Sequence, residues 1–292
     1  MVTAIRIALG LFTAWFGFFF VKDYSAASKN SQLEKDTSFI KTAIIGFITN
    51  FFDTLGIGSF APTTTLLRSF KQIHDRVLPG TLNVSCTIPV VIEAFIFISV
   101  IEVEMLTLVS LIVAAIVGAV VGAGVVAKWD EKKVQVVMGI ALLVTAFLMF
   151  SGQAGWTKSL GTGTAIGLTG IKLIIAVVVN FILGALMTAG IGLYAPCMAM
   201  IYMMGLSPKV AFPIMMGSCA FLMPPAGVKF IKEGAYNKKA SMAITVGGVI
   251  GVFIAAYIVK SLPIKILTYL VIVVVLYTAI TLLRDSMKKV TA

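Results

Sequence analysis

Long apolar runs, separated by short polar segments, make up most of this chain. Seven runs are close to the ~20 residues that a helix needs to cross the hydrocarbon core of a bilayer. They lie near 3–21, 79–100, 104–127, 134–151, 208–228, 240–260 and 263–283. Two more runs, near 39–71 and 168–204, are too long for a single crossing. The pattern predicts an all-α polytopic membrane protein in which the two longest runs are interrupted.

The interruption is a phrase that the chain contains twice. Gly56-Ile57-Gly58-Ser59-Phe60-Ala61-Pro62 returns 134 positions later as Gly190-Ile191-Gly192-Leu193-Tyr194-Ala195-Pro196. Glycine and proline are the residues that interrupt helices. The same shift aligns Phe47-Ile48 with Phe181-Ile182 and Pro79 with Pro213. It also brings the runs near 104 and 134 close to those near 240 and 263, so we expect a duplicated unit.

The predicted organisation follows from this duplication. Residues 1–38 form a first transmembrane helix and a basic loop, 39–152 a first repeat, 153–167 a linker and 168–292 a second repeat. Each repeat is expected to hold a broken or re-entrant helical hairpin followed by three transmembrane helices. A cleaved signal peptide is a weaker interpretation of the first run. Arg6 alone makes a weakly charged n-region, and the apolar stretch is longer than the usual h-region of a signal peptide.

The basic residues indicate how the interrupted runs cross the membrane. If each run is a hairpin that returns to its own side, 17 basic residues lie on one side and 6 on the other. The richer side then carries the segments 22–41, 68–76, 128–133, 229–239 and 284–292. If each run crosses once, the split is 10 against 13. Because cytoplasmic loops are enriched in Lys and Arg, we favour hairpins, inverted repeats and a cytoplasmic C-terminus.

The composition is that of a membrane protein, and the placement of the charges argues against a nucleic-acid partner. Hydrophobic residues make up 59% of the 292 positions and charged residues 12%. The net charge of +11 lies in short loops, so topology explains it and no nucleic-acid partner is expected. The expected location is the plasma membrane, as a multi-pass protein in contact with the lipid bilayer. A homo-oligomer is left open.

The two hairpin tips are the predicted substrate site. If each proline begins the returning arm, each tip presents a helix N-terminus with free N–H groups and partial positive charge. Two such ends make a cradle for a small anion, and small polar residues add donors. The competing interpretation is that these small polar residues only pack in helix interfaces, where such residues are common in membrane proteins. The candidate substrate-binding residues are Gly56, Gly58, Ser59, Pro62, Thr63, Asn83, Ser85, Gly190, Gly192, Tyr194, Pro196, Cys197 and Ser218.

Two carboxylates are candidates for coupling transport to protons. Asp53 lies three residues before the first tip, and Glu93 lies in the middle of an apolar run. An acid in hydrocarbon is costly and usually faces a cavity or a partner. Asp53 could instead hold the hairpin by accepting backbone N–H bonds. The single histidine, His74, and three unpaired-looking cysteines give no metal or disulfide pattern, and no cofactor is expected.

The paired Gly-Ile-Gly tips, their prolines and the duplicated layout resemble the TauE/SafE family of sulfite exporters, also called the toluene sulfonate uptake permeases. By position, Gly56, Gly58 and Pro62 match the first motif of the family, and Gly190, Gly192 and Pro196 match the second. Ser59-Phe60 and Leu193-Tyr194 stand where the family usually has further glycines and a longer gap to the proline. The resemblance implies a transporter for small sulfur-containing oxyanions or organic anions.

The leading hypothesis is therefore a secondary transporter, not an enzyme, that binds sulfite or another sulfur oxyanion or organosulfonate between the tips and works by alternating access. An alternative keeps the fold and moves a cation or neutral solute, with Asp53 and Glu93 as ligands. An intramembrane enzyme is a remote alternative, because no His-Glu pair, Gly-x-Ser-x-Gly or paired-Asp arrangement is present.

Overall fold

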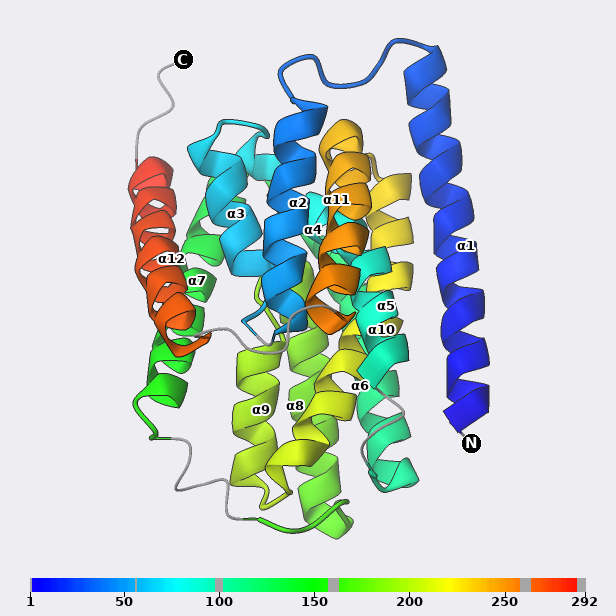
Figure 1. Cartoon of the computed structure of the whole chain (residues 1–292), viewed down its shortest axis with the longest axis vertical. Helices are drawn as coiled ribbons and strands as arrows, with labels where there is room; N and C mark the ends of the chain where they lie inside the picture. The colour runs from blue at the N-terminus through cyan, green and yellow to red at the C-terminus, as the bar shows by residue number, and fades with distance from the viewer. Residues whose placement is uncertain (1, 56, 98–101, 157–162, 258–263, 288–292) are drawn as a thin grey trace.

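The computed structural model describes residues 2–55, 57–97, 102–156, 163–257 and 264–287, and these ranges are almost wholly helical (Figure 1). Apart from an isolated bridge between Ala165 and Leu206, they contain no β-structure. The first half holds α1 Val2–Lys29, α2 Phe39–Thr54, α3 Phe60–Ser69, the short 3₁₀ helix η1 Asp75–Val77, α4 Leu78–Ser85, α5 Thr87–Phe97, α6 Met105–Val126 and α7 Glu131–Gln153. The second half holds α8 Gly170–Thr188, α9 Tyr194–Met203, α10 Pro208–Lys232, α11 Lys238–Tyr257 and α12 Ile264–Met287.

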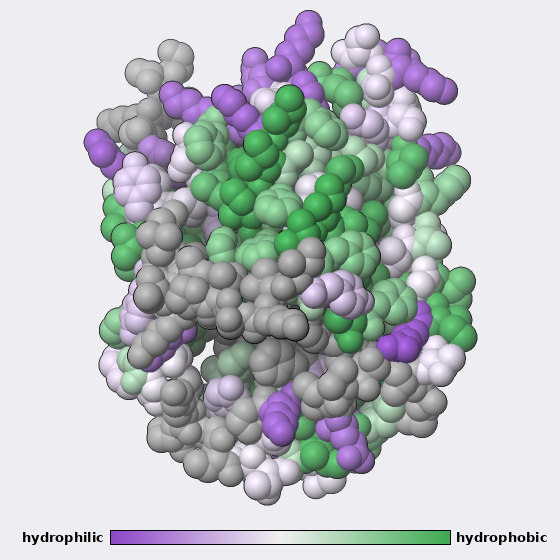
Figure 2. Space-filling model, in the orientation of Figure 1, coloured by the Kyte–Doolittle hydropathy of each residue, from purple (hydrophilic) through white to green (hydrophobic). Residues whose placement is uncertain are grey.

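Within the described ranges, seven helical stretches are long and apolar enough to cross a membrane. They run over Thr3–Lys29, Asp75–Ile96, Met105–Val126, Glu131–Gln153, Gly170–Thr188, Pro213–Lys232 and Lys238–Tyr257. Large apolar side chains such as Phe18, Ile171 and Phe147 are exposed on the outside of the bundle. In Figure 2 many hydrophilic residues of the visible face lie at the upper end, with a hydrophobic band below them, and others lie in the lower half. The chain is an integral membrane protein.

The two interrupted runs form the predicted helical pairs. The first pair is α2 with α3, and the second is α8 with α9. In Figure 1, α2 and α3 occupy the upper half of the molecule and α8 and α9 the lower half, so that α2 ends and α9 begins near the middle. The returning arms α3 and α9 have 10 residues each. At 1.5 Å per residue such an arm spans about 15 Å, roughly half of the hydrocarbon core.

Each hairpin packs along a helix of the other half of the chain, with backbones in close contact. The helix α2 lies along α11, and α8 lies along α6. A Cβ atom built at Gly247 in α11 would lie 1.9 Å from the carbonyl oxygen of Ala43 in α2. A Cβ atom at Gly118 in α6 would lie 2.0 Å from that of Phe181 in α8. Small residues allow this approach, which is how helices associate in membranes without a hydrophobic driving force.

The run predicted near 79–100 is one crossing with a break in the middle. The break falls at Cys86, between α4 and α5, and its cause is Pro89, whose ring excludes the carbonyl of Ser85 from the helical ladder. The freed Ser85 carbonyl accepts a bond of 2.8 Å from Thr245 Oγ1 of α11. The apolar pattern of the sequence predicted this run as uninterrupted, and the partner that compensates for the break comes from the other half of the chain.

The loops that carry most of the basic residues meet at one end of the bundle, called the basic end below. The loop after α1 lies beside the start of α11, where Thr37 Oγ1 accepts from Asn237 Nδ2 at 2.8 Å and Glu34 accepts from the Lys238 N–H. Lys238 also pairs with Asp23 of α1. Figure 1 shows the α1–α2 loop and the end of α12 at this same end.

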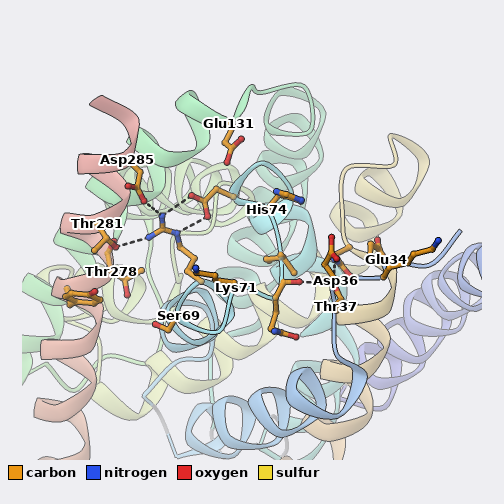
Figure 3. A pocket seen from close by; sticks show the side chains of 17 residues that line it. Glu34, Asp36, Thr37, Ser69, Lys71, His74, Glu131, Thr278, Thr281 and Asp285 are labelled. Carbon is orange, nitrogen blue, oxygen red and sulfur yellow. Dashed lines mark hydrogen bonds and ion pairs between the residues drawn. The ribbon is translucent and has the colours of Figure 1, made fainter. Parts of the chain in front are cut away.

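A salt-bridge cluster at the basic end connects the first hairpin to α12 (Figure 3). Arg68, in the last turn of α3, donates to Asp75 of η1 at 2.8 Å and 3.0 Å, and to Asp285 of α12 at 2.7 Å. Its Nη1 also donates to Thr281 at 2.8 Å. Burial alone would lower the pKa of Arg68, but Asp75 and Asp285 raise it, so the guanidinium stays charged. These groups line a cleft of about 830 Å³.

Replacing Arg68 by Met is expected to lower the free energy of unfolding by about 1–2 kcal/mol, because it leaves the buried Asp75 and the half-buried Asp285 without their cation. Thermal unfolding of the detergent-solubilised protein measures the change. Lys71→Met is the matched control, since Lys71 lines the same cleft without an ion pair to the described acids. Equal melting temperatures for Arg68→Met and Lys71→Met would show that the cluster adds nothing to stability.

Candidate functional site

A small cavity of about 50 Å³ lies where the two hairpins meet. Water needs about 10–15 Å³ of such volume, so the cavity has room for a few waters or one small polyatomic ion. It is lined by Asp53, Ile57, Gly58, Ser59, Phe60, Ala61, Val90, Thr145, Met149, Met187, Gly192, Leu193, Tyr194 and Cys219. Both tips contribute, and so do α5, α7 and α10.

The first tip directs Ser59 toward Asp53. Gly58 has a φ of +90°, a conformation that L side chains avoid, and it turns the chain from α2 into α3. Ser59 is the N-cap residue of α3, and its hydroxyl donates to Asp53 Oδ2 at 2.8 Å instead of accepting from the first turn of the helix. The first intrahelical bond of α3 runs from the Thr63 N–H to the Ser59 carbonyl. The N–H groups of Phe60 and Ala61 therefore have no partner within the helix.

The second tip also turns at a positive-φ glycine before a short helix, but the glycine has a different place in the repeated phrase. It is Gly190, at +94°, the first of its two glycines, whereas Gly58 is the second of its pair. The helix α9 begins at Tyr194. The first intrahelical bond of α9 joins the Cys197 N–H to the Leu193 carbonyl. The N–H of Tyr194 thus has no partner within α9, and its side chain lines the cavity.

The prolines of both tips lie deeper in their helices than expected. Pro62 and Pro196 are the third residues of α3 and α9, not the first, because the helices begin at Phe60 and Tyr194. Proline is tolerated there since the first turn needs no N–H donor for the helical ladder. Each helix therefore begins two residues earlier than expected, closer to the glycines of its tip.

Glu93 of α5 joins the two tips. It accepts a bond of 2.8 Å from Thr54 Oγ1, at the end of α2, and a longer one of 3.4 Å from the Tyr194 hydroxyl of α9. Glu93 is 0% exposed and Asp53 2% exposed. Sequence reasoning placed Glu93 in an apolar run but could not identify Tyr194 as its partner, because the two belong to different repeats.

The structure brings some of the predicted residues to the cavity and leaves others in packing roles. Asp53, Gly58, Ser59, Gly192 and Tyr194 line it. The other described candidates do not line it. Thr63 bonds Thr49 within the hairpin at 2.8 Å, Asn83 donates to the carbonyls of Met187 and Thr188 at 3.4 Å, and Ser85 donates to Leu82. Ser218 accepts from Asn180 at 3.0 Å, Cys197 is buried in α9, and Pro62, Gly190 and Pro196 lie in the tips without reaching the cavity wall. Gly56 lies outside the described residues.

The contribution of α7 to the cavity wall was not predicted from the sequence. Thr145 and Met149 face the cavity from this helix, although α7 is not part of either hairpin. Thr145 is an isolated hydroxyl residue in an apolar run, and that was the one available signal. Its own hydroxyl donates to the Ala141 carbonyl at 2.9 Å, so its oxygen can still accept.

The cavity offers hydroxyl groups, helix starts and one carboxylate to a bound molecule. Within the described ranges, no group of three or more His, Cys, Asp or Glu side chains is placed to hold a metal ion. The cysteines Cys86, Cys197 and Cys219 are buried thiols. This donor set supplies hydrogen-bond donors and acceptors of the kind that can hold a small polar solute.

Fold and site together define a polytopic helical membrane protein with a small cavity, lined by both apolar and polar side chains, between two helical hairpins. A family model, sulfite exporter TauE/SafE, matches residues 1–149 and 172–291, and the chain belongs to this family. The family is one of membrane transporters. No curated protein and no solved structure matches the chain.

Proposed function

We propose that the chain is a secondary transporter that binds sulfite, or another small sulfur-containing oxyanion or organosulfonate, between the tips of its two hairpins. The observation that carries the proposal is the cavity at the start of α3 and α9, with Ser59 and Tyr194 on its wall. Helix starts attract anions through free N–H groups and partial positive charge, and hydroxyls donate to anionic oxygens. Membership of the sulfite exporter family supports the substrate class.

The size of the cavity favours a small ion. About 50 Å³ accommodates a compact oxyanion, whereas a large organic anion would need the walls to move apart. Val90, Met149 and Met187 supply an apolar part of the wall that could accommodate the carbon end of a small sulfonate. The proposed substrate range is therefore sulfite and the smallest organosulfonates.

We further propose that the two repeats are inverted and that alternating access moves α7 and α12 against the rest of the bundle. The helices α7 and α12 pack mainly on each other, and they meet the hairpins through α3 and α9. The cavity lies between α7 and the two tips. Separation along the α3–α12 contact would open the cavity toward the basic end, and separation along α7–α9 would open it toward the other end. The basic end is the proposed cytoplasmic side.

Flux of radiolabelled sulfite into liposomes tests the proposed function. We expect uptake that saturates with sulfite concentration and is inhibited by methanesulfonate but not by sodium or potassium chloride. Empty liposomes and liposomes with heat-denatured protein are the controls. Absence of flux for sulfite, sulfate, thiosulfate and methanesulfonate, from protein shown to be folded, would contradict the proposal.

A second candidate function is transport of a cation or neutral solute, and the observation that favours it is the pair of buried acids. Asp53 lines the cavity, as a cation ligand would. Asp53→Asn separates the two functions, because loss of the carboxylate should abolish cation binding. Sulfite binding should survive the same change.

A further inference from the structure

We propose that Asp53 is a proton-operated switch for anion binding, in which its carboxylate holds the Ser59 hydroxyl and a proton on Asp53 releases that hydroxyl to the anion. The inference rests on the proposed function and deepens it, since it names the coupling ion and the order of binding. Protonation precedes anion binding, and one proton accompanies each anion in the same direction.

The hydrogen bond between the two residues determines where the Ser59 hydrogen points. A carboxylate can only accept, so the 2.8 Å bond to Asp53 Oδ2 occupies the single hydroxyl hydrogen of Ser59. Once Asp53 carries a proton, its own O–H donates to Ser59 Oγ. The Ser59 hydrogen is then free to turn into the cavity, which both side chains line.

Among the residues that the structure describes, no cation pairs with Asp53 to balance its charge. The titratable side chains that interact electrostatically with it are Glu93 of α5, Cys86 at the end of α4, Tyr194 of α9 and Cys219 of α10. Thiols and phenols are ordinarily neutral at neutral pH. None of the ion pairs within the described ranges includes Asp53 or Glu93. An anion that enters beside an ionised Asp53 would meet repulsion in a low-dielectric site.

Glu93 has a different role, as a positioning residue for the second tip. It is fully buried, does not line the cavity, and is held by Thr54 and Tyr194. Two acids without a cation cannot both ionise cheaply, so Glu93 stays neutral while Asp53, which faces the cavity, exchanges its proton. A neutral Glu93 keeps Tyr194 in place in both states.

The proton balance of a cycle is simple. Asp53 takes one proton from water on the side to which the cavity is open, and the anion then binds to the released Ser59 hydroxyl. After the site opens to the other side, the anion leaves and Asp53 returns its proton to water there. The net flux follows the summed gradients of anion and proton, and each ligand raises the affinity for the other by the same factor.

Calorimetric titration of the purified protein with sulfite at about pH 6, 7 and 8 tests the switch. Above neutral pH, the sulfite dissociation constant of the wild type should rise about tenfold per pH unit beyond the change due to sulfite itself. Asp53→Asn imitates the protonated acid, so it should lose this extra slope and bind sulfite at pH 8 more tightly than the wild type. Glu93→Gln is the matched control and should keep the slope. Ser59→Ala should bind about ten- to hundredfold more weakly at pH 6.

The outcomes separate the switch from the proposed function. Sulfite binding with equal slopes in the wild type and Asp53→Asn, or unchanged affinity in Ser59→Ala, would overturn the switch alone. No sulfite binding by the wild type at any pH would overturn the proposed function and the switch together. If Asp53→Asn does not fold, titration of the wild type with sulfite at about pH 8, in two buffers of different ionisation enthalpy, decides. Uptake of about one proton per bound anion, beyond that of sulfite itself, supports the switch, and no such uptake overturns it.

Discussion

Replacement of Gly247 by leucine is expected to lower the free energy of unfolding by about 3 kcal/mol or more, a value at the upper end for overpacked interiors. Any Cβ at this position would lie 1.9 Å from the Ala43 carbonyl oxygen, which belongs to the backbone and cannot turn away. The helices α2 and α11 must then separate along their length. Because α2 carries the first tip, sulfite flux should fall together with stability.

Gly17→Ala in α1 is the control for this change, since nothing lies within 4 Å of a Cβ built there. It should be neutral or slightly stabilising, because alanine is the better helix former. The readouts are thermal unfolding in detergent and elution as a monodisperse species. A Gly247→Leu protein that unfolds at the same temperature as Gly17→Ala would show that the two helices do not approach as closely as described.

Replacement of Gly58 by alanine is expected to reduce sulfite flux at least tenfold. A left-handed backbone costs an L residue about 1–2 kcal/mol, and Gly58 has a φ of +90° with open space around it. The strain is relieved by turning the tip, which moves Ser59 away from Asp53. The loss should therefore appear in sulfite flux per folded molecule more than in the melting temperature.

The control for Gly58 is Gly152→Ala in α7, a glycine with open space and no positive φ. It should transport at the wild-type rate. If Gly58→Ala also transported at that rate, the geometry of the first tip would be unimportant for the substrate, contrary to the proposed site.

The helices and the two interruptions could be predicted from sequence because each has a local cause. Apolar runs of membrane length define the crossings, and Gly-x-Gly followed by proline marks both tips. The charge count also favoured the arrangement in which the loops after α1 and after α3 share one end, and contacts such as Thr37 with Gln72 join those loops. The start of α3 was misplaced by two residues, because proline is tolerated throughout the first turn and so does not mark the helix start.

The composition of the cavity was less predictable, because it depends on which helices meet. Asp53 and Ser59 are close in sequence, and their bond could be anticipated from their shared tip. The contact of Glu93 with Tyr194, and the approach of Thr145 from α7, depend on packing between distant parts of the chain. Asn83, Ser218 and Thr63 have the polar character of site residues, but they satisfy backbone or side-chain partners within helix interfaces.

The most direct test of the central claim is a structure of the protein with selenite, a heavier analogue of sulfite whose selenium can be located by anomalous scattering. We predict one selenium site between the hairpin tips, with a selenite oxygen at about 2.7–3.0 Å from Ser59 Oγ and another near the Tyr194 hydroxyl. Selenite bound instead in the cleft of Arg68 and Lys71 at the basic end, with the cavity between the tips empty at saturation, would contradict it.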